Sequence, residues 1–254
     1  GIAWDHINVF PTFENYCKQF QIFADKIEQN GSLVYFEEDA EINKIAKNLR
    51  KDIKAIPYKT HANKVQNGIT KLIVGDQQYA LKIFGEHNLQ NLNGAYYVCQ
   101  EMGISSVSFY MAMQTFCGAA KRLQLLASNN NTRVYQDFAH SPSKLKATVN
   151  AVKQQYQKKN VVAFMELHTF SSLNIKFLKE YEGSLDNADQ AIVFYSEHAI
   201  ELKKLENIDR NMVKKAFNKD DLKVITDREL LEKEIHEVDA LDTVFLSFMP
   251  AEST

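Results

Sequence analysis

Long apolar runs are absent from this sequence, as is a charged-then-apolar leader at its start. We therefore expect a cytoplasmic protein without a membrane partner. Only three cysteines occur, Cys17, Cys99 and Cys117, and their odd number and wide spacing exclude a complete disulfide framework, so buried thiols are the default. No basic block rises above the interspersed lysines and glutamates, and the net charge of −2 argues against nucleic acid as a partner.

The chain has 254 residues, of which 45% are hydrophobic and 24% charged. This length and composition are ample for a hydrophobic core and favour two domains. Before Ala119 the pattern predicts helices at 13–27, 41–50 and 87–102, a short strand at 33–36, and a hairpin of strands 69–74 and 79–84. Thr12 is expected to cap the first helix, and Ser105 or Ser106 a further one.

Beyond Ala119, strands and helices alternate regularly. Strands are predicted at 123–127, 133–138, 161–167, 191–195, 222–225 and 243–248, and helices at 142–156, 174–185, 199–205, 210–217 and 228–238. The first two strands flank an Asn129–Asn131 turn. This alternation predicts an α/β chain whose second part is a Rossmann-like domain with a mostly parallel sheet.

One heptad, Gly85-Glu86-His87-Asn88-Leu89-Gln90-Asn91, lies where a strand pattern gives way to a helix pattern. A turn glycine there places short polar side chains at a helix start, where unpaired backbone N–H groups favour a polar ligand. The alternative is that Asn88 is only an N-cap and His87 an ordinary turn residue.

Three further segments accompany the heptad in a fixed order: Trp4-Asp5-His6, Phe116 to Gln124, and Asp137-Phe138-Ala139-His140-Ser141-Pro142. Together they resemble D-H, F-x-G-x-x-R-R-x-E/Q and D-Y/F-A/G-H-x-P of the Mur ligases. These ATP-dependent enzymes add amino acids or peptides to UDP-N-acetylmuramate in bacterial wall synthesis. The branch that looks most similar is the murein peptide ligase, which adds the recycled tripeptide L-Ala-γ-D-Glu-meso-diaminopimelate.

The resemblance implies a domain organisation and a set of site residues. Residues 1–119 would be the later part of the central ATP-binding domain and 120–254 the C-terminal substrate-binding domain. The cofactors would be ATP and Mg²⁺, and the partners UDP-N-acetylmuramate and an amino acid or peptide. The implied roles are Mg²⁺ binding by His6, adenine contacts from His87, Asn88 and Asn91, nucleotide contact from Arg122, phosphate and Mg²⁺ contacts from Asp137 and His140, and substrate contacts from His168 and Ser172.

Plainer roles exist for several of these residues. His6 could be a loop histidine that caps 10–12, Arg122 a solvated surface residue, Asp137 a turn residue, and His140 an N-cap substitute. Asp137 and Arg122 are expected at strand or junction ends, outside the core, so that their removal would lower kcat and leave stability nearly unchanged.

The sequence departs from the family pattern in five respects. Gln21 stands where many relatives carry a carbamylated Lys, Thr169 replaces an Arg that binds substrate carboxylates, and the tail 248–254 lacks a Gly-rich ending. No G-x-x-x-x-G-K-S/T phosphate loop occurs, and the Mg²⁺-binding Glu has no counterpart.

These departures, with the start at Gly1, suggest a fragment that does not hydrolyse ATP by itself. Alternatives to the tripeptide ligase are a UDP-N-acetylmuramate–L-alanine ligase, a superfamily member that acts on a folate or polyamino acid, and a non-catalytic nucleotide- or peptide-binding module.

Overall fold

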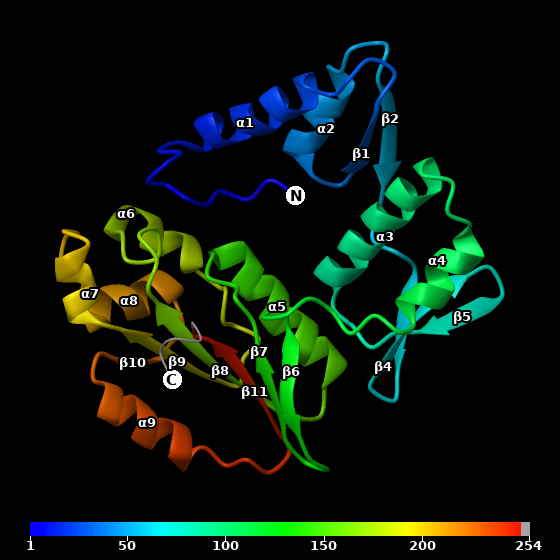
Figure 1. Cartoon of the computed structure of the whole chain (residues 1–254). Helices are drawn as coiled ribbons and strands as arrows, with labels where there is room; N and C mark the ends of the chain where they lie inside the picture. The colour runs from blue at the N-terminus through cyan, green and yellow to red at the C-terminus, as the bar shows by residue number, and fades with distance from the viewer. Residues whose placement is uncertain (250–254) are drawn as a thin grey trace. The chain divides into compact units, whose positions relative to one another are not determined.

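A computed structural model describes residues 1–249. The chain divides into two compact units, Gly1–Cys117 and a second that begins at Gly118 (Figure 1). The predicted features of the tail beyond Met249 lie outside the described residues. No helix in the described part of the chain is long and apolar enough to cross a membrane.

The first unit opens with two helices on a small parallel sheet. Thr12 caps the first helix, because its hydroxyl accepts a 3.1 Å hydrogen bond from the N–H of Asn15. Apolar side chains of both helices pack around Ala24 and Ile45, as the three- and four-residue spacing predicts. The elements are α1 (Phe13–Asp25), β1 (Ser32–Phe36), α2 (Ala40–Lys47) and β2 (Lys54–Tyr58), with β1 and β2 parallel.

The rest of the first unit is an antiparallel sheet with two helices. Leu72, Leu89 and Tyr110 belong to its core, to which sheet and helices both contribute. Ser105 caps the second helix, since its hydroxyl accepts from the N–H of Ser108 at 3.2 Å. The elements are β3 (Asn63–Gln66), β4 (Ile69–Val74), β5 (Gln77–Ala80), α3 (Glu86–Glu101) and α4 (Ser106–Met113).

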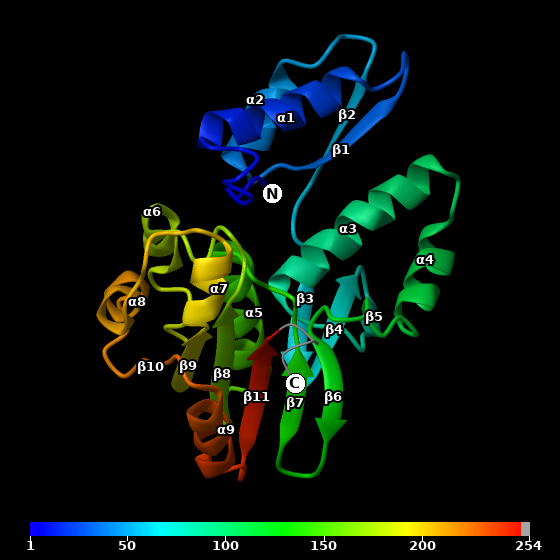
Figure 2. The same ribbon diagram turned by 60° about the vertical axis from the view of Figure 1, so that its left-hand side comes forward.

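The second unit is built on a six-stranded sheet with the order β10-β9-β8-β11-β7-β6 (Figure 2). Five strands are parallel, and the edge strand β6 pairs antiparallel with β7 across the Asn129–Asn131 turn. The strands are β6 (Gln124–Ser128), β7 (Arg133–Gln136), β8 (Asn160–Leu167), β9 (Gln190–Tyr195), β10 (Lys223–Ile225) and β11 (Thr243–Phe248).

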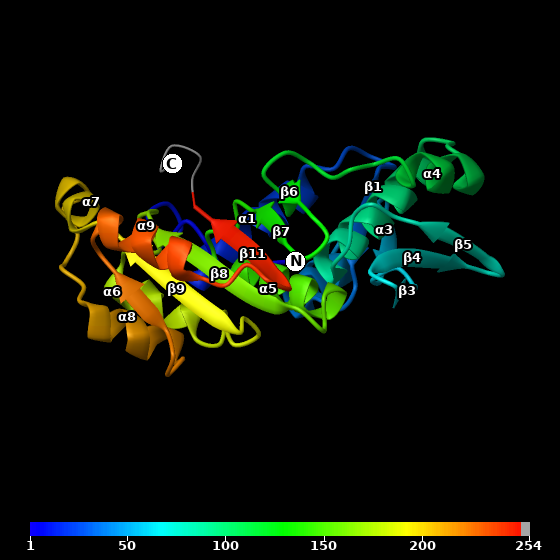
Figure 3. The same cartoon turned by 90° about the horizontal axis from the view of Figure 1, so that it is seen from below.

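Helices cover both faces of this sheet. Leu231 of α9 packs on Val162 and Phe164 of β8, while α5 and α8 lie on the opposite face (Figure 3). Residues 161–165 of β8 are all buried, as expected of a central parallel strand covered on both sides. The helices are α5 (Pro142–Gln155), α6 (Ile175–Leu178), the 3₁₀ turn η1 (Lys179–Tyr181), α7 (Glu197–Leu202), α8 (Arg210–Phe217) and α9 (Arg228–Glu237).

The α/β prediction with a mostly parallel second sheet is confirmed, and most predicted elements are present within a few residues. The prediction of one helix over 174–185 is wrong, because α6 ends at Leu178 and only a 3₁₀ turn follows. The sequence patterns also missed β2 and β3, which are mostly exposed; β2 pairs with the earlier β1, and β3 pairs with β4 across the short turn Asn67–Gly68. The expected burial of the cysteines is wrong for Cys117, which is exposed, and Cys17 and Cys99 are only half-buried.

Candidate functional site

The predicted nucleotide-binding heptad forms the start of α3. Gly85 precedes the helix with φ 91°, a left-handed conformation that favours glycine, and its carbonyl accepts from the N–H groups of Asn88 and Leu89. The alternative role of Asn88 as N-cap is wrong, since it lies inside the helix and its Nδ2 donates to the Phe84 carbonyl at 2.8 Å. This bond orients the half-buried Asn88 amide, leaving its Oδ1 as the acceptor for a ligand donor.

The charge at this helix start bears on what it can bind. Glu86 occupies the first turn, so the positive end of the helix dipole already has an anionic neighbour. A second anion such as a phosphate is disfavoured there, whereas an uncharged ring with amino and ring-nitrogen groups is not. His87 is half-buried and Asn91 is exposed one turn later on the same side of the helix.

His6 lies in the loop before α1 with its backbone in a left-handed conformation, φ 55°. Its N–H donates to Oδ1 of the buried Asp5 at 2.8 Å, and its Nε2 lies 3.9 Å from Asp5 Oδ2. The His6 carbonyl accepts from the N–H groups of Val9 and Phe10. The loop thus uses the backbone of His6 for its turn and places the imidazole beside a carboxylate.

The second unit begins with an unusual short segment. Lys121 and Leu123 have φ values of 58° and 43°, and the exposed Arg122 lies between them. Left-handed backbone in two non-glycine residues so close together requires hydrogen bonds that hold it. They come from Gln124, whose Oε1 accepts from the Lys121 N–H at 2.8 Å, and from the segment that follows β7.

Asp137, directly after β7, is only 4% exposed, so the prediction that it lies outside the core is wrong. Its Oδ2 accepts from the Leu123 N–H at 3.1 Å and from Thr148 Oγ1 at 3.0 Å, and its own N–H donates to the Ser247 carbonyl at 3.0 Å. Burial raises the pKa of Asp137, while these donors and the positive charge of Arg122 oppose the rise.

His140 and His168 follow β7 and β8, so both lie at the carboxyl edge of the parallel strands, where open α/β sheets bind ligands. Their ring centroids are 6.3 Å apart, and Phe138 lies 5.1 and 6.2 Å from them. Nδ1 of His140 lies 3.1 Å from the Phe138 carbonyl, and Nδ1 of His168 lies 3.1 Å from the Glu166 carbonyl. Because a carbonyl only accepts, Nδ1 carries the proton in each ring and Nε2 is the basic atom.

The alternative of His140 as an N-cap substitute is also wrong. Ser141 occupies the position before α5, and Pro142 is the first helical residue, as predicted. The His140 carbonyl accepts a hydrogen bond from the Tyr181 hydroxyl. His140 is therefore held through its backbone while its half-buried ring faces Phe138.

Ser172 does not suit its predicted role as a substrate contact. Its side chain is fully buried, and its hydroxyl exchanges hydrogen bonds of 3.0 to 3.1 Å with the backbone and hydroxyl of Thr169. The Ser172 N–H also donates to Thr169 Oγ1 at 3.1 Å. This reciprocal pair shapes the turn after β8, and of the predicted substrate residues only His168 stays accessible.

Thr148 and Phe138 were not among the predicted site residues. Thr148 is a buried helix residue in α5, and no local sequence signal marks it as a partner of Asp137. Phe138 belongs to the D-F-A-H-S-P motif, but nothing in the sequence singles it out. Only the fold shows that its ring is 44% exposed and lies beside both histidines.

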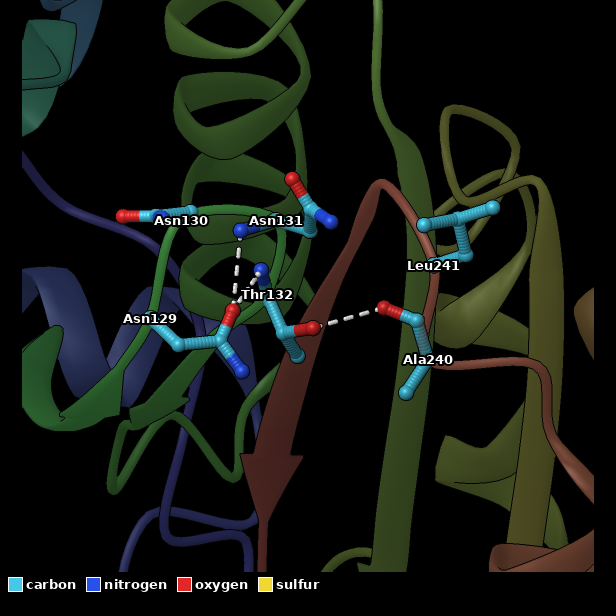
Figure 4. Close-up of a pocket in the computed structure, with 6 residues that line it drawn as sticks. All are labelled: Asn129, Asn130, Asn131, Thr132, Ala240 and Leu241. Carbon is cyan, nitrogen blue, oxygen red and sulfur yellow. Dashed lines mark hydrogen bonds between the residues drawn. The ribbon is translucent and has the colours of Figure 1, made fainter.

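A cavity of about 450 Å³ opens elsewhere on the second unit (Figure 4). Its lining comes from the β6–β7 turn and the loop before β11, where Thr132 Oγ1 donates to the Ala240 carbonyl at 2.7 Å. Both loops precede parallel strands, so this cavity lies at the amino edge of the sheet, opposite His140 and His168. The lining residues are Asn129, Asn130, Asn131, Thr132, Ala240 and Leu241.

The two units, described by their geometry, correspond to a known pair of domains. The family model "Mur ligase middle domain" matches residues 1–99, and "Mur ligase, glutamate ligase domain" matches residues 121–247. The chain therefore belongs to the Mur ligase family, a class of ATP-dependent amide ligases.

Individual relatives agree with this assignment. A UDP-N-acetylmuramate–L-alanine ligase of Caldicellulosiruptor saccharolyticus is 31% identical over 201 residues, covering 74% of this chain and 44% of the relative. This chain thus spans less than half the length of that curated relative.

Solved structures show the same fold. The UDP-N-acetylmuramate–alanine ligase of Thermotoga maritima has 17% identity and a TM-score of 0.65, with 96% of this chain and 53% of the other covered. A murein peptide ligase of Psychrobacter arcticus has 15% identity and a TM-score of 0.58, with 96% and 52% covered.

Proposed function

We propose that this chain forms the later part of the central ATP-binding domain and the C-terminal domain of an ADP-forming ligase. This ligase joins an amino acid or peptide to UDP-N-acetylmuramate in the cytoplasm. In this reaction a substrate carboxylate attacks the γ-phosphorus of ATP, giving ADP and an acyl phosphate. The incoming amine then attacks the acyl carbon, and phosphate leaves as the amide forms. The observation that carries the proposal is the match of two consecutive Mur ligase models to the two units.

The start of α3 supports a contact with the adenine ring. Asn88 is oriented by its bond to the Phe84 carbonyl and keeps an acceptor for the adenine amino group, and Asn91 lies one turn along. The negative charge of Glu86 agrees with binding of the uncharged base rather than of the phosphates. The phosphates are assigned to Arg122, an exposed guanidinium suited to paired phosphate contacts.

In this proposal, His6 would be a ligand of the Mg²⁺ ion. The carboxylate of Asp5 beside the imidazole supplies the oxygen that Mg²⁺ prefers, with water for the remaining positions, so the residues present fit the ion. When bound, the ion neutralises charge on the transferred phosphoryl group.

His140 and His168 are assigned to the reacting amine and its carboxylate. With Nδ1 protonated, Nε2 of either ring can accept a proton from the ammonium group of the donor, which leaves the neutral amine free to attack, and the imidazolium so formed attracts a carboxylate. The exposed ring of Phe138 beside both histidines excludes water from part of this edge.

The choice of amine donor has two candidates. No Lys or Arg occurs between residues 160 and 175, and the first cation after β8 is the exposed Lys176 in α6, so the turn itself offers little positive charge for the several carboxylates of an acidic tripeptide. This supports L-alanine, the donor named for the 31% identical relative. The second candidate is the tripeptide of the murein peptide ligase branch, supported by resemblance of the D-F-A-H-S-P element.

A donor panel tests the proposal. The full-length gene product is incubated with ATP, Mg²⁺, UDP-N-acetylmuramate and either L-alanine, the tripeptide or a glutamate donor with a folate, and ADP release is measured. Release that needs UDP-N-acetylmuramate and L-alanine supports the first candidate, and tripeptide-dependent release the second. Release with the folate alone, or nucleotide binding without release under all conditions, contradicts the proposal.

A further inference from the structure

The segment Lys121–Leu123 is held in a costly conformation. Left-handed backbone is unfavourable for a non-glycine residue, and it persists only where surrounding contacts determine it. Two such residues flank Arg122, so the direction of its side chain depends on both bends being kept. The contacts that keep them therefore decide where the guanidinium is presented.

Asp137 supplies the buried contact. The bond from the Leu123 N–H to Asp137 Oδ2 joins two residues that are 8% and 4% exposed. The adjacent Phe138 N–H donates to the Lys121 carbonyl at 2.9 Å, so both left-handed residues are tied to the chain after β7. Two further contacts are local in the chain: the Lys121 N–H donates to Gln124 at 2.8 Å, and the Arg122 N–H donates to the Ala119 carbonyl at 3.2 Å.

The carboxylate is itself fixed from two directions. Thr148 of α5 donates to the same Oδ2, and the Asp137 N–H donates to the Ser247 carbonyl of β11. The helix and the central sheet thus set the position of the carboxylate before it accepts from Leu123. A group that served Mg²⁺ or phosphate directly would need an accessible oxygen, whereas this side chain is turned inward.

We infer that Asp137 is a positioning residue that holds Lys121–Leu123 in its left-handed bends and so fixes the direction of Arg122. This differs from the direct phosphate contact that the sequence motif predicts for it. That Arg122 contacts a nucleotide rests on the proposed function. That Asp137 holds the segment Lys121–Leu123 does not depend on it.

Trypsin provides a local test, because its cleavage sites follow Lys121 and Arg122 themselves. In Asp137→Ala we expect cleavage at these two bonds to rise by at least about tenfold, since a buried N–H loses its acceptor and the bends open. Asp137→Asn keeps an oxygen acceptor and removes a charge that burial disfavours, so its cleavage rate should stay within about threefold of wild type.

A control for general loss of stability is an exposed carboxylate that also accepts from the N–H of a strand residue. Asp189 Oδ2 accepts from the Val161 N–H at 2.7 Å and from Lys153, at the amino end of the sheet. Asp189→Ala should lower overall stability without favouring cleavage after Lys121 or Arg122. Equal cleavage in the two alanine variants at matched stability overturns the inference. If Asp137→Ala does not fold, Thr148→Val, which removes one anchor of the carboxylate, should raise cleavage a few-fold, and no rise overturns it.

A double-mutant cycle with Mg²⁺ and ADP distinguishes positioning from direct contact in the full-length protein. If Asp137 acts through Arg122, then Arg122→Ala weakens ADP binding and adding Asp137→Ala weakens it no further. Additive losses mean direct contact and overturn the inference. If wild-type protein binds no ADP, the proposed function fails, while the trypsin result still decides whether Asp137 holds the segment.

Discussion

Tyr110→Phe removes one hydroxyl from the core of the first unit and tests how its buried polar pair is arranged. His61 Nδ1 lies 2.9 Å from the Ala62 carbonyl and therefore carries the proton, so Nε2 accepts from the Tyr110 hydroxyl at 2.9 Å. The side chains are 8% and 4% exposed, which keeps water away from the bond. The substitution leaves Nε2 as a buried acceptor without its donor.

The expected loss is about 1–3 kcal/mol in the free energy of unfolding, the range for a buried polar group that loses its partner. Tyr79→Phe is the matched control: its ring stacks on Tyr110 at 5.1 Å, but its hydroxyl bonds to the exposed Gln77, so we expect a change within about 0.5 kcal/mol. Urea unfolding followed by tryptophan fluorescence reports this unit, because Trp4 is the only tryptophan. Equal losses in both variants would refute the reasoning.

Four further outcomes are expected. Burial raises the pKa of Tyr110 to about 12, so with rising pH the unfolded state loses this proton before the folded state does. The free energy of unfolding should therefore fall between about pH 10 and 12. Urea titrations at several pH values should show a smaller fall for Tyr110→Phe. Ser172→Ala should cost about 1–2 kcal/mol of stability and leave the KM for the amine donor unchanged, whereas His168→Ala should raise that KM; a Ser172→Ala effect on KM alone would restore its predicted substrate role. Asn91→Ala should weaken ADP binding in calorimetry without a change in melting temperature, because its side chain is exposed. The 254-residue chain expressed alone should show no ATPase activity above background, since it contains no phosphate loop, and turnover comparable with a full-length relative would contradict this.

Local sequence patterns predicted most of the elements for identifiable reasons. The caps Thr12 and Ser105, the N1 position of Pro142 and the turn at Asn129–Asn131 each depend on residues within one turn of each other. The alternation of strands and helices after Ala119 was enough for a parallel sheet, because crossover connections allow few other arrangements. β2 and β3 were missed because their stability comes from pairing rather than from their own pattern.

The candidate site was only partly accessible to sequence reasoning. The motif spacing located the start of α3 and placed Asp137 and His140 at the carboxyl edge of the sheet. It could not show that Asp137 is buried or that the hydroxyl of Ser172 is used within its own turn, because burial depends on elements that pack from elsewhere in the chain. Thr148, eleven residues beyond Asp137, is a partner that only the docking of α5 reveals.

By itself, then, the sequence determined the family and the order of helices and strands, since both follow from short motifs and from hydrophobic periodicity. The tertiary structure decided which polar motif residues are buried and which stay accessible. Whether a carboxylate such as Asp137 faces a ligand or a backbone N–H depends on which surfaces are covered. Which side chains are buried is set by how the layers of sheet and helix pack on one another, and no single segment of the chain encodes that packing.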